Sequence, residues 1–520
     1  MLCILTSAPD AANTWPILED YLRFQLWIAI KLAKPIYTPG NLPSNHAALL
    51  ISTRYRRNLK HAKTRIAYTY CPACDKTTKD YGGKKHTYHY YGTLMSDVWR
   101  DFAWDFRHSP HAIEGRLADL LGVPPHSRLH SVDLLGVSEL KASHDESSVS
   151  TYPGLNKVAS GPKVSSSLAQ GDCLQILADL PEKSVDFAFA DPPYNLAKSY
   201  DRYDDTIDTR DYFTWCDRWI DALARVLREG CSCAILNIPH SAIRHFRHMA
   251  ESMEFQTWIV WEGLSLPVRM IMPAHYSLVC FSKGPPRPLP GFDTPIVSHE
   301  RAELNATREF FCSRQACLRR RRAAGVPDTD LITDLWWDIH RLKHNSRRVD
   351  HPCQLPPALM RRLIALFTHP GELVLDPFNG AGTTTLCAQQ MERRYLGIEL
   401  SPEYHQLAQN RHAHLARGGD PFEKAQATPK AKNSRVKRLL KTRYAVPKKT
   451  LQLDVKRIAG VVGHTPSREE VIVHSPYPVE YFDSYFVDWG EVTAAARTTG
   501  MTEDHRLTEP GIENSQPRLF

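Results

Sequence analysis

The sequence predicts an α/β protein organised around a doubly wound, Rossmann-like parallel sheet. Short apolar runs of strand length alternate with segments of helical periodicity, as in successive β-α-β units. Two of these runs end abruptly at corners rich in proline or glycine, where open parallel sheets hold their ligands. A chain of 520 residues is long enough for such a domain and for one or two smaller ones.

The first β-α-β unit lies near the middle of the chain. Residues 185–190 (VDFAFA) are uniformly apolar and predict a buried parallel strand. Helical spacing follows over 212–227, and residues 231–238 (CSCAILNI) predict the next strand.

A second set of elements follows after residue 350. Residues 356–367 predict a helix that opens with proline, and residues 373–376 (LVLD) predict a buried strand. A glycine-led helix over 380–391 and a further strand over 394–400 complete the alternation. The two sets together predict one parallel sheet with helices on both faces.

Composition divides the rest of the chain. A Ser-, Gly- and Pro-rich stretch without apolar periodicity predicts a linker, and a Lys- and Arg-rich stretch without acids predicts a second one. Residues 451–471 predict two helices around a turn, with Ser467 as an N-cap, as in a small helix-turn-helix. The expected parts are an N-terminal region (1–140), a linker (141–167), the central α/β domain (168–415), a basic linker (416–450) and a small helical C-terminal domain (451–520).

Bulk composition restricts the class of protein. With 42% hydrophobic and 23% charged residues, the chain is typical of soluble globular proteins. The apolar stretch 22–33 contains Arg23, Gln25 and Lys31, so no membrane span is expected. No signal peptide is evident, and 12 scattered cysteines favour the reducing cytoplasm. The net charge of +8 favours a polyanionic partner, either nucleic acid or a membrane surface.

A glycine-rich loop follows the strand at 373–376. Asp376 ends the strand, and Gly380 and Gly382 lead into a helix N-terminus, where the backbone can approach a ligand closely. The next strand ends at Glu399, where an acid can accept both ribose hydroxyls of an adenosine. This pattern indicates an adenosine-containing cofactor. An ordinary glycine-rich turn and a dinucleotide site are the alternatives, although the full G-x-G-x-x-G is missing.

The segment Asp191-Pro192-Pro193-Tyr194 follows the strand at 185–190, and its prolines predict a rigid corner. An exocyclic base amine is a poor nucleophile because its lone pair is delocalised into the ring. Acceptors for its two N–H bonds, here the Asp191 carboxylate and the Pro192 carbonyl, would draw the lone pair back onto nitrogen. Tyr194 offers an aromatic face to a base swung out of a duplex. The alternative is a turn with a hydrogen-bonded tyrosine.

At these residues the sequence resembles the amino DNA methyltransferases. FADPPYNL (189–196) is similar to their catalytic motif, and LDPFNGAGTT (375–384) to their methionine-binding motif. Because the catalytic motif comes first, the order is similar to that of the circularly permuted β class, in which a target-recognition region lies between the motifs, here at about 240–350. The resemblance covers about 168–415 and implies S-adenosylmethionine as cofactor and double-stranded DNA as partner.

The resemblance also implies which residues form the site. GDCLQIL (171–177) is similar to the segment that lies near the cofactor adenine, and HPCQLP (351–356) to the segment that closes over the methionine end. It further implies direct methyl transfer from sulfonium to nitrogen, without a metal or a covalent enzyme–base intermediate. The implied catalytic residues are Asp191, Pro192, Pro193 and Tyr194, and the implied cofactor-binding residues are Asp172, Asn195, His351, Gln354, Asp376, Pro377, Phe378, Gly380, Gly382, Thr383, Thr384 and Glu399.

The resemblance also bears on the acceptor base, through Asp191 of the catalytic motif. ADPPYN is similar to the adenine-N6 enzymes, whereas a serine in place of Asp191 more often marks cytosine-N4 enzymes. Site-specific methylation of adenine N6 is therefore expected. Cytosine N4, an RNA amine and a catalytically inactive zinc-finger scaffold are the alternatives. A role in restriction–modification fits the expectation, and the oligomeric state, including a homodimer, is left open.

The N-terminal region departs from the resemblance. Cys71 and Cys74 are followed by His86 and His89, a C-x2-C…H-x2-H spacing that predicts a small structural zinc site. The alternative is a turn with surface histidines. A basic segment at 53–65 would then contact phosphate, with a solvated basic face as its alternative.

Within 240–350, Arg319 to Arg322 and the segment 334–348 could hold DNA, although its tryptophans fit a core equally well.

Overall fold

The computed structural model describes most of the chain. The described residues are 1–54, 64–77, 93–105, 110–123, 161–195, 207–263, 275–292, 300–340, 354–423, 448–482, 489 and 498–499, without the single residues 39, 310, 313 and 480. In this part of the chain, no helix is long and apolar enough to cross a membrane.

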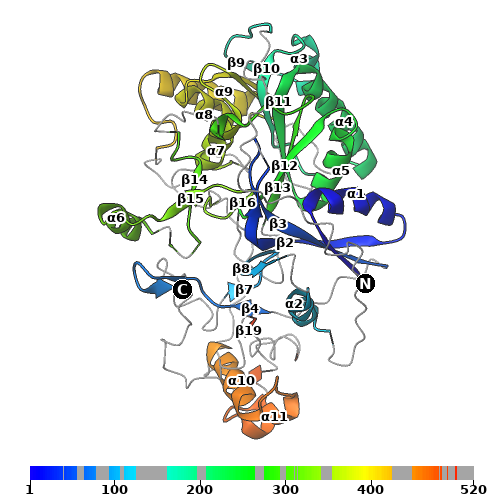
Figure 1. Ribbon diagram of the computed structural model, residues 1–520, viewed down its shortest axis with the longest axis vertical. Helices are drawn as coiled ribbons and strands as arrows, with labels where there is room; N and C mark the ends of the chain where they lie inside the picture. The colour runs from blue at the N-terminus through cyan, green and yellow to red at the C-terminus, as the bar shows by residue number, and fades with distance from the viewer. Residues whose placement is uncertain are drawn as a thin grey trace.

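An eight-stranded sheet forms the centre of the protein (Figure 1). Five neighbouring strands, from β11 to β9 in the order below, run parallel, and β13 is antiparallel to both of its neighbours. The strands are, in spatial order, β16 (Leu335–Trp336), β12 (Glu254–Trp261), β13 (Tyr276–Ser282), β11 (Leu227–Asn237), β10 (Val185–Ala190), β17 (Leu373–Asp376), β18 (Arg394–Glu399) and β9 (Ser167–Gln170).

Helices cover both faces of this sheet, so the predicted doubly wound architecture is confirmed (Figure 1). Alternate residues of β10 supply the two cores: Ala188 and Ala190 pack on one face, and Phe187 and Phe189 on the other. One face carries α3 (Cys173–Asp179), α4 (Thr209–Val226) and α5 (Pro239–Met249), and the other carries α7 (Pro357–Phe367), α8 (Thr383–Gln390) and α9 (Pro402–Ala416).

The strands at 185–190 and 373–376 have the predicted bounds. The glycine-led helix, expected from residue 380, begins at Thr383 as α8. Gly380 and Gly382 have φ values of 51° and 81°, in the left-handed region, and cannot belong to a right-handed helix. The loop before α8 is thereby turned toward the carboxyl ends of the strands.

The N-terminal region packs directly on the central domain. It forms a sheet of β1 (Leu2–Thr6), β3 (Ser44–Thr53), β2 (Arg23–Ile36) and β8 (Val98–Trp104), with α1 (Ala8–Leu18) and α2 (His111–Leu121). Trp27 stacks on Trp258 of β12, with ring centroids 5.1 Å apart. Arg100 and Glu262 form an ion pair of 2.6 Å across the same contact. The two sheets therefore share one hydrophobic core.

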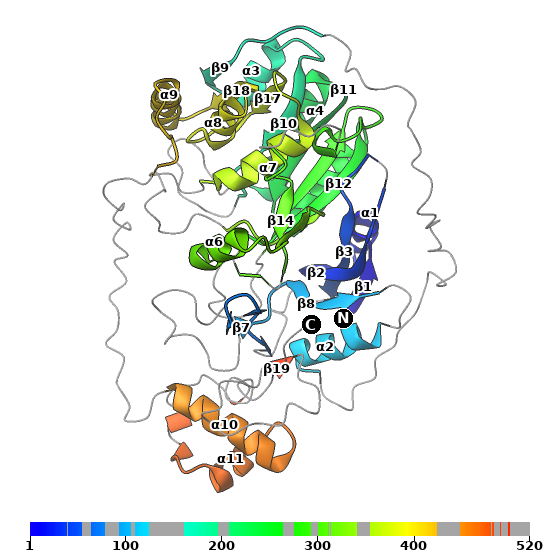
Figure 2. The same ribbon diagram turned by 60° about the vertical axis from the view of Figure 1, so that its left-hand side comes forward.

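Several short elements lie outside the two larger sheets, and α6, β7 and β19 are seen below the eight-stranded sheet in Figure 2. Segments far apart in the sequence meet there, because Thr498 and Thr499 pair with Arg65 and Ile66. These elements are β4 (Arg65–Ile66), β5 (Tyr70–Cys71), β6 (Lys76–Thr77), β7 (Thr93–Leu94), β14 (Asn305–Thr307), α6 (Gln315–Ala323), β15 (Thr329–Leu331) and β19 (Thr498–Thr499).

The two helices expected near the C-terminus are confirmed as α10 (Lys448–Val462) and α11 (Arg468–His474). Ser467 caps α11 as predicted: its side chain accepts the backbone N–H of Glu470, whose carboxylate accepts the N–H of Ser467. Leu451, Val455 and Val471 belong to the small core of this pair.

Candidate active site

The two chemical motifs meet at one edge of the central sheet. β10 pairs in parallel with β17, with Ala188 opposite Leu375, so both strands end at the same edge. Asp191 directly follows β10, and Asp376 is the last residue of β17. Motifs far apart in the sequence are therefore neighbours in space, at the place where open α/β sheets bind ligands.

A cavity of about 240 Å³ lies between the two motifs. Most of the residues that the sequence assigned to the site line it, whereas Asn195 and Gly382 do not, and His351 lies outside the described residues. The predicted residues in the lining are Asp172, Asp191, Pro192, Pro193, Tyr194, Gln354, Asp376, Pro377, Phe378, Gly380, Thr383, Thr384 and Glu399.

Hydrogen bonds fix the corner after β10. The Tyr194 hydroxyl donates to Asp191 Oδ1 at 2.6 Å, and the Tyr212 hydroxyl of α4 donates to the Pro193 carbonyl at 2.8 Å. Asn195 has a φ of 55°, and its side-chain amide donates to the Ile207 carbonyl at 2.7 Å. The Asn195 side chain therefore ties the corner to Ile207 by a hydrogen bond, and Asn195 is not among the residues that line the cavity.

Glu399 is anchored at the other end of the cavity. Its two carboxylate oxygens accept the backbone N–H groups of Gly380, at 2.7 Å, and Ser401, at 2.8 Å. A carboxylate has about four acceptor positions, so these two bonds leave capacity for the hydroxyls of a ligand.

Asp172 lies close to Glu399. The backbone N–H of Gly171 donates to the Glu399 carbonyl at 3.0 Å, and the Asp172 side chain caps α3 through the N–H of Leu174 at 2.7 Å. The Gly-Asp segment thus closes the Glu399 end of the cavity.

Asp376 is the buried acid between the two ends. Its Oδ1 accepts the backbone N–H of Phe378 at 2.9 Å. Burial, with a smaller contribution from the charges of Asp191 and Glu399, raises the pKa of Asp376 to about 7. Burial also raises the pKa of Glu399. A cavity with several acids and elevated pKa values is suited to a cationic ligand.

Comparisons with known proteins identify this arrangement. A family model described as DNA methylase, of the N6/N4 type, matches residues 185–410. YubD of Escherichia coli K12 is 30% identical over 250 residues, which cover 48% of this chain and 90% of YubD. The chain belongs to the N6/N4 DNA methylase family.

This chain covers different shares of two further methylases. Type II methyltransferase M.BamHI of Bacillus amyloliquefaciens is 32% identical over 242 residues, which cover 45% of this chain but only 54% of M.BamHI. YhdJ of Escherichia coli K12, named a DNA adenine methyltransferase, is 27% identical over 243 residues, which cover 46% of this chain and 79% of YhdJ. The N-terminal sheet described above lies outside the residues that match the family model.

The cofactor of this methylase family is S-adenosylmethionine, and the cavity fits it. The cofactor carries a sulfonium and an ammonium charge, and the buried Asp376, between the two ends of the cavity, is the acid that complements a cation. Asp376 is the clearest sign, because a buried carboxyl with a pKa near 7 is stabilised as an anion by a nearby cation.

Three aromatic residues in the lining were not predicted. Trp215 of α4, Trp261 at the end of β12 and Tyr276 at the start of β13 all line the cavity. Tyr276 lies 6.1 Å from Tyr194 and 5.4 Å from Trp261, between ring centroids. For Trp261 and Tyr276 the available signal is their position at strand ends, but a lone aromatic at a strand end is more often core.

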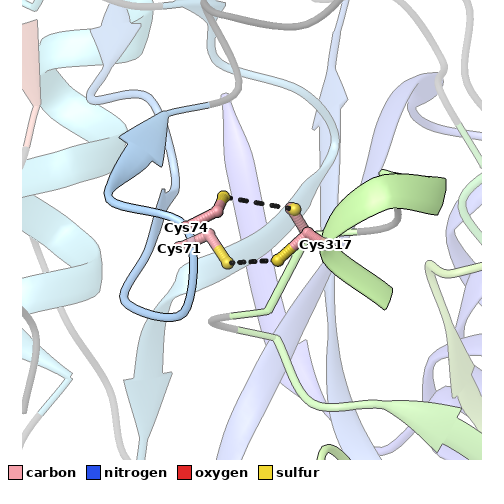
Figure 3. A group of neighbouring side chains, drawn as sticks. Cys71, Cys74 and Cys317 are labelled. Atoms are coloured by element: carbon pink, nitrogen blue, oxygen red, sulfur yellow. Dashed lines mark hydrogen bonds between the residues drawn. The ribbon is translucent and has the colours of Figure 1, made fainter. Parts of the chain in front are cut away.

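The predicted zinc ligands are only partly described. His86 and His89 lie outside the described residues. Cys71 and Cys74 instead face two cysteines that the sequence did not suggest, Cys312 and Cys317 (Figure 3). The ligand atoms of all four lie within 4.8 Å of one another, so this cluster needs no histidine to reach four ligands.

The residues that the sequence suggested for contact with DNA differ in how far they are exposed. In α6, Arg319, Arg320 and Arg322 are exposed, whereas Arg321 is buried. Trp336 is fully buried in the same hydrophobic core as α7. For this tryptophan, the alternative of a core residue therefore holds over a contact with DNA. Most of the segment 53–65 lies outside the described residues.

Proposed function

We propose that this chain transfers a methyl group from S-adenosylmethionine to the exocyclic N6 amino group of adenine within a specific sequence of double-stranded DNA. The observation that carries the proposal is that an acid-lined cofactor site and an Asp-Pro-Pro-Tyr corner open into one cavity. The net charge of +8 favours the polyanionic substrate.

The cofactor end is assigned to the acids and the glycine loop. Glu399 would accept the ribose hydroxyls, Asp172 would lie at the adenine, and Asp376 would face the ammonium group. The cofactor supplies an electrophilic methyl on a sulfonium, so the protein has to bring a nitrogen lone pair in line with it.

The acceptor end is assigned to Asp191, Pro192 and Tyr194. The Asp191 carboxylate and the Pro192 carbonyl would each accept one N–H bond of the amine, which localises its lone pair on nitrogen. An N–C bond forms as the S–C bond breaks, and the nitrogen then loses one proton to Asp191 or to water. A flipped base would lie against Tyr194, with Tyr276 and Trp261 completing an aromatic wall.

The choice of adenine rests on Asp191 and on one relative. Asp191 stands where the resemblance expects aspartate in adenine-N6 enzymes, and YhdJ carries the name of an adenine methyltransferase. Cytosine N4 is the second candidate, because its amine presents the same two N–H bonds. Since M.BamHI bears a Type II name, a place in a restriction–modification system is part of the proposal.

Purified protein with tritium-labelled S-adenosylmethionine and mixed-sequence duplex DNA tests the reaction. Digestion to nucleosides and mass spectrometry should find N6-methyladenine. N4-methylcytosine would favour the second candidate. Preferential labelling of RNA in competition would contradict DNA as the substrate, and cofactor binding without transfer to any nucleic acid would favour an inactive scaffold.

A further inference from the structure

Four cysteines from two distant segments converge on one point. Cys71 ends β5, Cys74 lies in the turn between β5 and β6, and Cys312 and Cys317 lie just before and within α6. The Cys71 and Cys317 sulfurs are 3.9 Å apart, and those of Cys74 and Cys312 are 3.7 Å apart (Figure 3). All four sulfurs lie within 4.8 Å of one another.

The distances of 3.9 Å and 3.7 Å match two edges of a metal tetrahedron. With Zn–S bonds of about 2.3 Å, the sulfurs of a tetrahedral site are about 3.8 Å apart. A disulfide would require about 2.05 Å, and none of the four cysteines is disulfide-bonded. The cluster therefore has the spacing of a four-thiolate site.

The first pair of cysteines lies on a tight hairpin built to present two sulfurs on one side. β5 and β6 pair as Tyr70 with Thr77 and Cys71 with Lys76, and the N–H of Cys74 donates to the Cys71 carbonyl at 3.3 Å. Asp75 closes the turn with a φ of 52° and accepts the Tyr70 hydroxyl at 2.6 Å.

A buried arginine lies against the cluster. Arg321 donates to the Cys317 sulfur at 3.1 Å, to the Cys312 carbonyl at 3.0 Å and to Asp328 at 2.5 Å. Zn²⁺ with four thiolates carries a net charge of about −2, so N–H donors and a nearby cation lower its energy in a buried place. A guanidinium directed at a cysteine sulfur fits a thiolate ligand better than a neutral thiol.

Among the described residues, the contact between the two segments centres on the cysteines. The local hydrophobic cluster comprises Cys71, Cys312, Cys317 and Phe311, with Ala73, Cys74 and Val326 partly buried against it. Four of its seven members are the cysteines themselves. Arg320 adds a hydrogen bond to the Ala73 carbonyl. A core this small is of the kind that a metal ion stabilises.

We propose that Cys71, Cys74, Cys312 and Cys317 bind one structural Zn²⁺ that fastens the N-terminal hairpin to α6. Four protein ligands close the coordination sphere, so the ion has no position for a substrate and does not take part in methyl transfer. Its role is to orient α6, whose exposed Arg319, Arg320 and Arg322 form a positive surface able to contact phosphates. The site does not depend on the proposed acceptor base.

Metal analysis of the purified full-length protein tests the proposal. Native mass spectrometry and elemental analysis should find one zinc per chain. Cobalt exchanged into the wild-type protein should give the thiolate charge-transfer bands and the strong visible absorption of tetrahedral all-sulfur coordination. A protein without metal, a disulfide in the cluster, or iron in place of zinc would overturn the proposal.

Variants locate the ion. Cys312→Ser with Cys317→Ser should lose the zinc, and Cys3→Ser, at a half-buried cysteine outside the cluster, should keep it. Cofactor affinity should be unchanged in both, because none of these cysteines lines the described cavity. Duplex affinity should fall several-fold only in the double variant. Zinc retained in a folded double variant would overturn the ligand assignment and favour a site that uses His86 and His89.

Discussion

At the scale of single residues, the proposed function gives Asp191 and Asp376 separate tasks. Asp191 lies at the corner after β10, where one of its oxygens accepts the Tyr194 hydroxyl. Asp376 lies in a buried position, where burial raises its pKa to about 7. The first is assigned to the amine and the second to the cationic cofactor, so their replacement should affect different steps.

Replacement of Asp191 should separate transfer from binding. Asp191→Ala removes an acceptor for the amine, and methyl transfer should fall at least about a hundredfold, as for other groups that act on a proton in the transition state. Cofactor affinity, measured by calorimetry, should change little, because the acids at the cofactor end remain. Wild-type transfer rates in the variant would contradict the assigned role.

Cofactor binding should depend on pH through Asp376. The folded pKa of about 7 exceeds the usual 3.8, so the cofactor-free protein loses stability as pH rises through this interval. A cationic ligand favours the ionised form, so its affinity should rise between about pH 6 and pH 8, and its binding should release a proton.

Thermal shifts with and without cofactor measure this dependence. The increase in melting temperature caused by the cofactor should grow with pH in the wild-type protein and become nearly pH-independent in Asp376→Asn. An equally steep profile in the variant would assign the dependence to another group.

At the scale of elements, the glycine loop before α8 forms part of the cavity wall, and the proposed function gives it the cofactor end. Gly382 has a φ of 81°, and a Cβ there would meet Ala408 of α9 at 3.1 Å. The loop therefore combines a left-handed turn with close helix packing, and a side chain at this position would displace it.

Gly382→Ala should weaken cofactor binding by tenfold or more. Gly371→Ala is the matched control, since Gly371 has the same φ of 81° and no described residue lies within 4 Å of the added Cβ. Both variants incur about 1–2 kcal/mol of backbone strain. Only the first should lose cofactor affinity in titration calorimetry. Unchanged affinity in Gly382→Ala would show that the loop tolerates the added methyl group, and equal losses in both variants would assign the effect to backbone strain.

The sequence predicted these elements unevenly, for physical reasons. β10 and β17 were predicted to the residue because strands buried on both faces are continuous apolar runs. Cys312 and Cys317 were not predicted, although their C-x4-C spacing is one that zinc ligand pairs use, because their partners lie far away in the sequence. Tyr276 was missed because its place at the cavity depends on the antiparallel insertion of β13 between β11 and β12.

At the scale of the whole molecule, the N-terminal sheet and the catalytic sheet behave as one body. Trp27 and Trp258 stack at 5.1 Å, and the buried pair of His275 and Asp97, at 2.9 Å, joins the same two parts. Composition had suggested a region set apart by a linker, but side-chain packing between distant strands is not visible in composition.

Trp27→Ala should therefore destabilise the entire protein. Loss of a buried tryptophan costs about 3–5 kcal/mol, and here it removes packing from the catalytic sheet as well. Thermal unfolding should remain a single transition at a lower temperature, whereas Tyr21→Ala, at a side chain that is 77% exposed, should have no effect. A catalytic part that unfolds at its original temperature would contradict a shared core.

The most direct test of the central claim is single-molecule sequencing of DNA from a methylation-free host that expresses the protein. The account predicts modified adenine within one sequence motif, absent from cells that express Asp191→Ala at the same level. Unmodified DNA in both strains, or the same modification in both, would contradict it.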